Sequence, residues 1–220
     1  MTEDPLDQRS LTSLIARLSD VGNAEPARAF PQDPAAAAQP GLYAWWVDKP
    51  GLDTLFAAFE RHLPPLVYAG QAGATSSRAR VERSATLRSR ISANHLNGNV
   101  RSSTFRRTLT AVLLEPLRLR LDRPGRLAAT DNQKVSDWMR QHLRVVIAAY
   151  PDRARLSQIE GEVLRRLDPP LNLMGMPPTP IRQRLTRLRA RLNTPPAPEA
   201  DDVATSGDFS IGDNTLEVPQ

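Results

Sequence analysis

The chain has 220 residues, a hydrophobic content of 40% and no cysteine. These values favour one domain with extensions, and they exclude disulfides, thiolate metal sites and cysteine nucleophiles. Its three histidines lie far apart in the sequence, which argues against a zinc site. No apolar run reaches transmembrane length and the N-terminal segment is acidic and polar, so we expect a soluble cytoplasmic protein without a membrane partner.

The positive charge is unevenly distributed along the chain. Residues 194–220 contain six acidic residues and no Lys or Arg, so the formal net charge of +5 becomes +11 when those six acids are set aside. Nearly all of this charge is arginine, which binds phosphate through paired hydrogen bonds. A GC-rich genome would explain the preference for Arg over Lys but not the net excess. The charge therefore favours nucleic acid as a partner.

The first elements alternate between helices and strands. Leu11, Leu14, Ile15 and Leu18 would share one face of a helix over residues 10–20. Proline and small residues follow, and we expect a loop or linker over residues 22–40. Apolar runs then predict two strands, over residues 42–47 and 66–69, with a helix over residues 52–63 between them.

The middle of the chain predicts two helices, over residues 85–96 and 103–115, with Ser103 or Thr104 as the N-cap of the second. Residues 117–121 alternate in polarity and read as a short strand or an extended segment. A further helix over residues 130–143 precedes a third clear strand, which is rich in β-branched residues and covers residues 144–150.

Two more helices complete the pattern, over residues 155–167 and 179–193. The second has an apolar stripe surrounded by arginines, so it would either bind nucleic acid or pack on the core. The acidic, Pro-rich remainder has little to bury and is expected to be disordered, with a restraining contact to the arginines as one interpretation. The predicted divisions are 1–39 (helix and linker), 40–175 (α/β domain), 176–193 (Arg-rich helix) and 194–220 (acidic tail).

Five elements in this order carry chemistry. Residues 41–43, "GLY", and residues 68–70, "YAG", each place a tyrosine close to a glycine within a predicted strand. "LRSR" on the next helix ends at Arg90, and "EGEVLRRLDPPLN" runs from Glu160 to Asn172, twelve residues apart. This order resembles the GIY-YIG nuclease superfamily, over roughly residues 40–175. The long connection between the tyrosines is similar to that of its restriction-enzyme branch, and an uncharacterised stand-alone branch is the other reading.

The resemblance implies an α/β (α+β) fold with a small three-stranded, mixed or antiparallel sheet flanked by helices. It also implies an endonuclease that hydrolyses phosphodiester bonds in DNA by attack of water, leaving a 5′-phosphate and a 3′-hydroxyl. Gly41 and Gly70 would be the motif glycines, and Gly70 would permit close approach of backbone or substrate. Asn172 would hold the surroundings of the catalytic glutamate.

Each remaining site residue has a role that suits its chemistry. Glu160 is the carboxylate expected to bind Mg²⁺ or Mn²⁺, because Mg²⁺ is held by few carboxylates and several waters. Arg90 would pair with the scissile phosphate. By resemblance, Tyr43 and Tyr68 position or deprotonate the attacking water. A free tyrosine has a pKa near 10, so a neighbouring Arg or the metal would have to favour the phenolate.

Three of these assignments have close competitors. Arg88 lies two positions before Arg90, and Glu162 two positions after Glu160. Members of the family often have a His or Tyr four residues after the arginine, where this chain has Asn94 and then His95. A loosened helix before "NGN" would bring His95 to the site; otherwise Asn94 takes that position.

A basic surface is expected beside the site. Its predicted nucleic-acid-binding residues are Arg78, Arg80, Arg83, Arg88, Arg101, Arg106 and Arg107. The most plausible substrate is double-stranded DNA, and cutting both strands with one site per chain would favour a homodimer. The alternative function is a nucleic-acid-binding module without catalytic activity.

Overall fold

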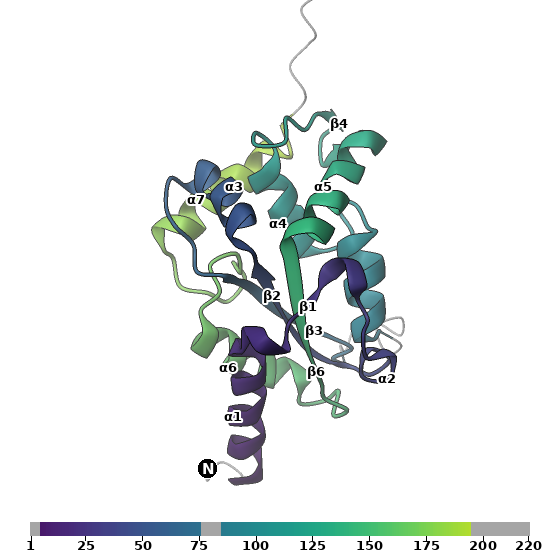
Figure 1. Cartoon of the computed structure of the whole chain (residues 1–220). Coiled ribbons are helices and arrows are strands. Elements are labelled where there is room, and N and C mark those ends of the chain that lie inside the picture. Colours follow the sequence, from purple (N-terminus) through teal and green to yellow (C-terminus); the bar gives the residue numbers. More distant parts are fainter. Residues whose placement is uncertain (1–4, 76–84, 195–220) are drawn as a thin grey trace, which may run out of the picture.

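The computed structural model describes residues 5–75 and 85–194 (Figure 1). Its centre is an antiparallel four-stranded sheet in the order β1-β6-β2-β3. The strands are β1 (Glu25–Pro26), β2 (Gly41–Val47), β3 (Leu66–Ala72) and β6 (Leu143–Ala149). The α/β class and the antiparallel sheet are confirmed, and the two-residue strand β1 adds to the three strands expected.

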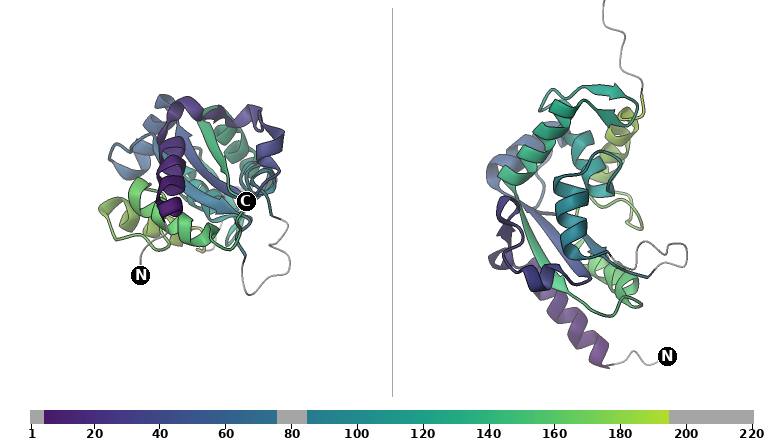
Figure 2. Two further views of the ribbon diagram at one scale, coloured as in Figure 1. Left: turned by 90° about the horizontal axis from the view of Figure 1, so that it is seen from below. Right: turned by 90° about the vertical axis from the view of Figure 1, so that its right-hand side faces the viewer.

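Helices cover both faces of the sheet, and Figures 1 and 2 show two groups of them at opposite ends of the molecule. On one face lie α1 (Pro5–Ser19) and α6 (Leu156–Leu167). On the other face lie α3 (Lys49–Phe59), η4 (Ser89–Leu96), α4 (Thr104–Leu113), α5 (Ala129–His142) and α7 (Pro180–Arg191).

Successive side chains of β2 point to opposite faces of the sheet, and this decides which helices each of them contacts. Leu42 and Ala44 are buried in the core beneath α1 and α6. Tyr43, Trp45 and Val47 are buried in the larger core on the opposite face. Because successive strand residues point to opposite faces, Tyr43 must face the layer that contains η4 and α4.

The segment expected to be a loop or linker instead contains several short elements. They are η1 (Val21–Asn23), β1, η2 (Ala27–Ala29) and α2 (Pro34–Ala37). Strand β1 pairs with β6 at Glu25 and Val145, and Ala37 is fully buried. These elements are too short for a periodic apolar pattern, so their sequence did not reveal them.

A small hairpin forms slightly later than the segment 117–121, where an extended stretch was expected. It consists of β4 (Leu121–Arg123) and β5 (Arg126–Leu127) in a separate two-stranded sheet. Gly125 in its turn has a φ of +70°, a backbone conformation that glycine adopts without steric strain.

Helix α7 is anchored on the core through its apolar stripe. Leu185, Leu188 and Leu192 are buried, and the helix packs against α4. Thr179 caps its first turn by accepting a hydrogen bond from the Arg182 backbone N–H. The leucines therefore pack on the core, and Arg182 of the same helix is buried with them.

Several predictions concern residues outside the described ranges. These are Arg78, Arg80 and Arg83 in the basic loop, together with the acidic segment after residue 194. No helix in the described part of the chain is long and apolar enough to span a membrane.

Candidate active site

The two motif tyrosines project from the same face of the sheet. Tyr43 pairs with Gly70, and Trp45 pairs with Tyr68, in the antiparallel ladder of β2 and β3. A Cβ atom on Gly70 would lie 2.7 Å from Tyr43 Oη and 3.4 Å from Tyr68 Cε1. Because Gly70 has no side chain, the Tyr43 phenol has room above β3. Tyr68 lies two residues before Gly70, so its ring lies on the same face of that strand.

Gly41 serves the sheet rather than the chemistry. A Cβ atom at this position would overlap the Ala148 carbonyl oxygen and lie 2.9 Å from Ala149 Cα. Glycine is needed here because β2 and β6 approach closely at the point where β2 begins.

His95 is hydrogen-bonded to Tyr43. Its Nε2 lies 2.9 Å from Tyr43 Oη, and its Nδ1 lies 2.8 Å from Ser103 Oγ. The imidazole is almost completely buried, and burial lowers its pKa well below the ordinary value, with positive charge on Arg90 and Arg106 acting in the same direction. The ring is therefore neutral at physiological pH and has one nitrogen able to accept a proton.

The helix that carries His95 is a π-helix, η4. Its hydrogen bonds join residues five apart, as between the Asn97 N–H and the Ser92 carbonyl at 2.9 Å. One turn of such a helix brings Arg90 and His95, also five apart, to the same face. Asn94 is only half-buried, so His95 is the residue that meets Tyr43.

Arg90 is half-buried, whereas Arg88 is exposed. The positive charge of Arg90 acts on Tyr43, Tyr68 and Glu160, and it lowers the pKa of each. Its Nε is buried without a hydrogen-bond partner among the described residues. The guanidinium is thus held beside the tyrosines with unused donor capacity, which suits an anionic ligand.

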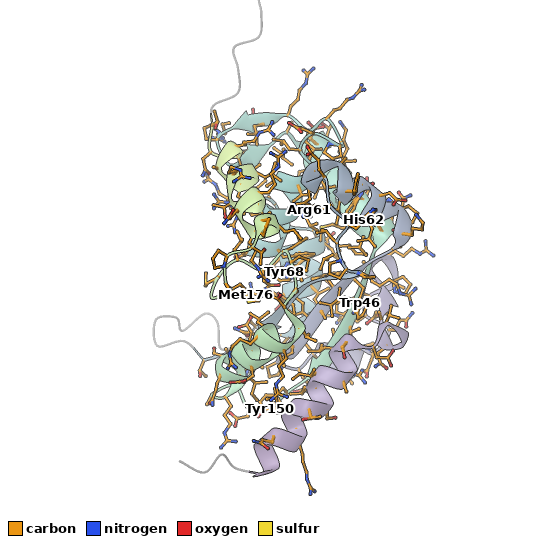
Figure 3. All side chains as sticks on the ribbon, turned by 90° about the vertical axis from the view of Figure 1, so that its left-hand side faces the viewer. Trp46, Arg61, His62, Tyr68, Tyr150 and Met176 are labelled. Carbon is orange, nitrogen blue, oxygen red and sulfur yellow. The ribbon has the colours of Figure 1, made fainter. Side chains whose placement is uncertain are left out.

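Both phenols keep their protons in the free protein. Burial raises the pKa of Tyr43 well above its ordinary value and also raises that of Tyr68. The negative charge of Glu160 adds to this effect, and Arg90 opposes it only in part. Figure 3 shows Tyr68 between α6 (green) and α7 (yellow-green).

Glu160 lies on α6 and is half-buried. Burial raises the pKa of its carboxyl group to about 7, opposed by Arg90 and by a hydrogen bond from the Gln71 backbone N–H. Glu162, its competitor, forms an ion pair with Arg165 on the same helix. The carboxylate near the tyrosines is therefore that of Glu160.

The spacing of twelve residues between Glu160 and Asn172 has a structural reason. Asn172 accepts a hydrogen bond from the Ala69 N–H at 3.0 Å and donates one to the Ala69 carbonyl at 2.8 Å. Glu160 accepts from Gln71, two residues further along the same strand. Because β3 is the edge of the sheet, helix α6 and the segment after it must return along this edge to satisfy its free backbone groups. Asn172 therefore fixes the strand between Tyr68 and Gly70.

The burial of Arg106 contradicts its predicted contact with nucleic acid. The side chain is 0% exposed and lies beneath α5, donating hydrogen bonds to the carbonyls of His95 and Leu96 and to Asn132 and Ser136. Burial lowers its pKa to about 10. Arg106 is thus a structural residue that holds η4, α4 and α5 together.

The other described arginines of the predicted surface remain accessible. Arg88 and Arg101 are exposed, and Arg107 is half-buried. Two further residues near the site had no distinguishing signal in the sequence. Ser103 was expected only as an N-cap, and Arg189 was one arginine among several in its helix.

The residues around Glu160 fit a divalent cation held by one carboxylate. Among residues 5–75 and 85–194, no group of three or more His, Asp or Glu side chains gathers as a metal site. The Glu160 carboxylate is half-buried with a raised pKa, so its charged form lacks full compensation. A cation that keeps most of its waters, such as Mg²⁺, would supply that compensation.

The chain is similar to a known family of protein domains. A model described as the GIY-YIG catalytic domain matches residues 41–191. This range extends beyond residue 175, where the sequence placed the end of the domain, and it includes α7. Neither the curated proteins nor the solved structures gave a significant match.

Proposed function

Since the chain belongs to the GIY-YIG nuclease superfamily, we propose that it is a metal-dependent endonuclease that hydrolyses phosphodiester bonds in DNA. One observation carries the proposal: Tyr43 and Tyr68 project from one face of the sheet beside Gly70. The charges of Arg90 and Glu160 act on both phenols, and the four side chains come from four different elements. Such a group of two phenols, a guanidinium and a carboxylate suits hydrolysis of a phosphate ester.

Arg90 would bind the scissile phosphate. Its side chain is half-buried, and its buried Nε has no hydrogen-bond partner among residues 5–75 and 85–194, so the protein leaves donor capacity of this guanidinium unused. The same positive charge would stabilise the negative charge that develops on phosphorus oxygens as water attacks.

Tyr43 and His95 would activate the water. In this mechanism the Tyr43 phenol takes a proton from water while it passes its own proton to His95 Nε2, which lies 2.9 Å away. The neutral imidazole supplies the acceptor that a buried phenol needs. Ser103 bonds to the other ring nitrogen and fixes the orientation of the imidazole, and Tyr68 would orient the water from the opposite side of Gly70.

Glu160 would hold Mg²⁺ or Mn²⁺. When bound, the cation would act as a Lewis acid that stabilises charge on the phosphate and on the leaving oxygen. The role of Glu160 itself is to provide a carboxylate at the end of β3, fixed there by the Gln71 N–H.

Nicking of supercoiled plasmid with Mg²⁺ or Mn²⁺ tests the proposal. We expect Glu160→Gln and Arg90→Ala to reduce the rate by about 100-fold or more. Glu162→Gln and Arg61→Ala are the controls, since each makes the same chemical change at a residue outside the site and the predicted basic surface, and both should stay within a few-fold of wild type. Activity that survives Glu160→Gln and Arg90→Ala would show that the site is misassigned.

The second candidate is a nucleic-acid-binding module without catalytic activity. It is favoured by the burial of both phenols, which keeps them protonated in the free protein. Tight DNA binding with no nicking in either metal would establish this function in place of the nuclease.

A further inference from the structure

A groove next to the candidate active site is lined by arginine. It has a volume of about 440 Å³ and lies between α4, α7 and the β4–β5 hairpin. Arg101, Arg107 and Arg189 line it, with Asn193 at the end of α7. A second hollow of about 580 Å³ shares Arg101 and adds Arg123 and Arg126, so the basic lining continues across the hairpin.

Among residues 5–75 and 85–194, no carboxylate forms an ion pair with Arg101, Arg107 or Arg189. No acidic side chain lines it within the described part of the chain. Arg107 donates a hydrogen bond to Asn193 Oδ1 at 3.0 Å, but its buried Nε meets no acceptor in the part of the chain that the structure describes. Burial lowers the pKa of Arg189, and the neighbouring charge of Arg107 lowers it further. Two like charges held together in a half-buried place are stabilised when an anion binds between them.

The groove adjoins the reaction centre on two sides. Arg189 interacts electrostatically with Tyr68 as well as with Arg107. Ser103 lies in the wall of the groove, and its Oγ contacts His95, the partner of Tyr43. An anion in the groove is therefore close to any phosphate that Arg90 holds.

We propose that Arg107 and Arg189 bind a backbone phosphate of the substrate strand adjacent to the scissile phosphate, with Arg101 at the edge of the same site. The inference rests on the proposed function and names the part of the substrate that the groove takes. Guanidinium groups that contact phosphates fix the position of a strand without reading its bases. The site would therefore add affinity and register but no sequence preference.

Fluorescence anisotropy with a short labelled DNA duplex tests this site. The protein is the full chain with Glu160→Gln, in EDTA, so that binding is measured without cleavage. We expect Arg107→Ala and Arg189→Ala each to weaken binding by about tenfold at low salt. Each should also reduce the slope of log K against log salt by about one, because one phosphate contact is lost. The affinity of each variant for two duplexes of different sequence should fall by the same factor.

Arg187→Ala is the matched control, since Arg187 is exposed on the same helix and carries the same charge. Equal affinities and slopes for the Arg187 and Arg189 variants would overturn the proposal. Arg107→Lys and Arg189→Lys keep the charge of the folded protein, and we expect them to bind DNA with intermediate affinity. Melting curves identify any alanine variant that fails to fold, and the lysine variants then decide: wild-type affinity in both would also overturn the proposal.

The binding and nicking measurements separate the two hypotheses. A wild-type protein that nicks DNA while the groove variants bind normally refutes the groove alone. A protein whose binding depends on Arg189 but which never nicks refutes the nuclease and retains the groove. A wild-type protein with no affinity for DNA refutes both.

Discussion

Tyr43 Oη lies 2.9 Å from His95 Nε2, although the two residues are 52 positions apart in the chain. Strand β2 places the phenol, and the π-helical turn of η4 places the imidazole. Ser103 holds the other ring nitrogen at 2.8 Å. In the proposed mechanism, this buried pair would give a proton from the attacking water a route away from the phosphate.

The Tyr43–His95 pair should behave as one unit in kinetics. We expect Tyr43→Phe and His95→Phe each to reduce plasmid nicking by about 100- to 10,000-fold, the usual contribution of general acid–base catalysis. The double variant should be no slower than the worse single variant, because either change breaks the same proton route. His62→Ala, at an exposed histidine, should leave the rate unchanged. If the rate reductions of the two single variants multiplied in the double variant, Tyr43 and His95 would act separately.

The Glu160 carboxyl should make stability fall as pH rises. Its folded pKa of about 7 is raised above the ordinary value of 4.5, so folding favours the protonated form. Its contribution is fully present below about pH 4.5 and is lost as the pH rises through about 7. Glu160→Gln removes this loss, so the variant should melt at a higher temperature than wild type at pH 8 in EDTA but not at pH 4.

Magnesium should reverse that difference, and activity should follow the same ionisation. Added Mg²⁺ would stabilise the wild type by binding its carboxylate, and the variant much less. At Mg²⁺ concentrations that do not saturate the site, nicking should decline as the pH falls below about 7, because protons compete with the cation for the Glu160 carboxylate. Parallel melting profiles for wild type and variant between pH 4 and 8 would contradict the assigned pKa.

Gly70→Ala should damage activity more than stability. The added Cβ would lie 2.7 Å from Tyr43 Oη and would displace the phenol from His95. We expect at least about a tenfold loss of nicking, since small displacements of reacting groups have large effects on rate. Gly161→Ala is the control, because a Cβ atom there meets nothing within 4 Å. It lies in α6, where alanine should stabilise the helix by about 0.5–1 kcal/mol.

Arg106→Leu should destabilise the fold without changing the electrostatics of DNA binding. The substitution leaves the buried carbonyls of His95 and Leu96 without their donor, and we expect a loss of about 3 kcal/mol in the free energy of unfolding. Arg101→Ala, at an exposed position, should change stability little and should lower the salt slope. Urea unfolding and salt titrations of binding measure both effects. If a folded Arg106→Leu variant had a smaller slope of log K for DNA binding against log salt, Arg106 would contact DNA after all.

Asn172→Leu should loosen the edge of the sheet beside Tyr68. It removes both hydrogen bonds to Ala69, so we expect a loss of about 1–3 kcal/mol in stability and a lower nicking rate. Hydrogen exchange of the Ala69 amide is the direct measurement, since its protection depends on the Asn172 side chain. Unchanged exchange at Ala69 would show that the strand is held by other contacts.

Local periodicity was enough to predict much of the fold. The alternation of strand residues fixes Tyr68 and Gly70 on one face. Arg90, Glu160 and Asn172 were predicted from the resemblance to the GIY-YIG nucleases, on "LRSR" and on the twelve residues between Glu160 and Asn172. The chain could also suggest that a loosened helix would carry His95, since "NGN" follows it directly.

Only the tertiary structure decided which arginines are buried and which are accessible. Arg106 and Arg107 are neighbours in sequence, yet one is buried among carbonyls and the other lines the groove. The Arg107–Arg189 pair and the contact between Ser103 and His95 join segments from different helices. By itself, the sequence determined the longer helices and the main strands, because their signals are local, and it suggested the motif residues through the resemblance to a family. Tertiary packing decided the exposure and the partners of each charge, because these depend on residues that are distant in the chain.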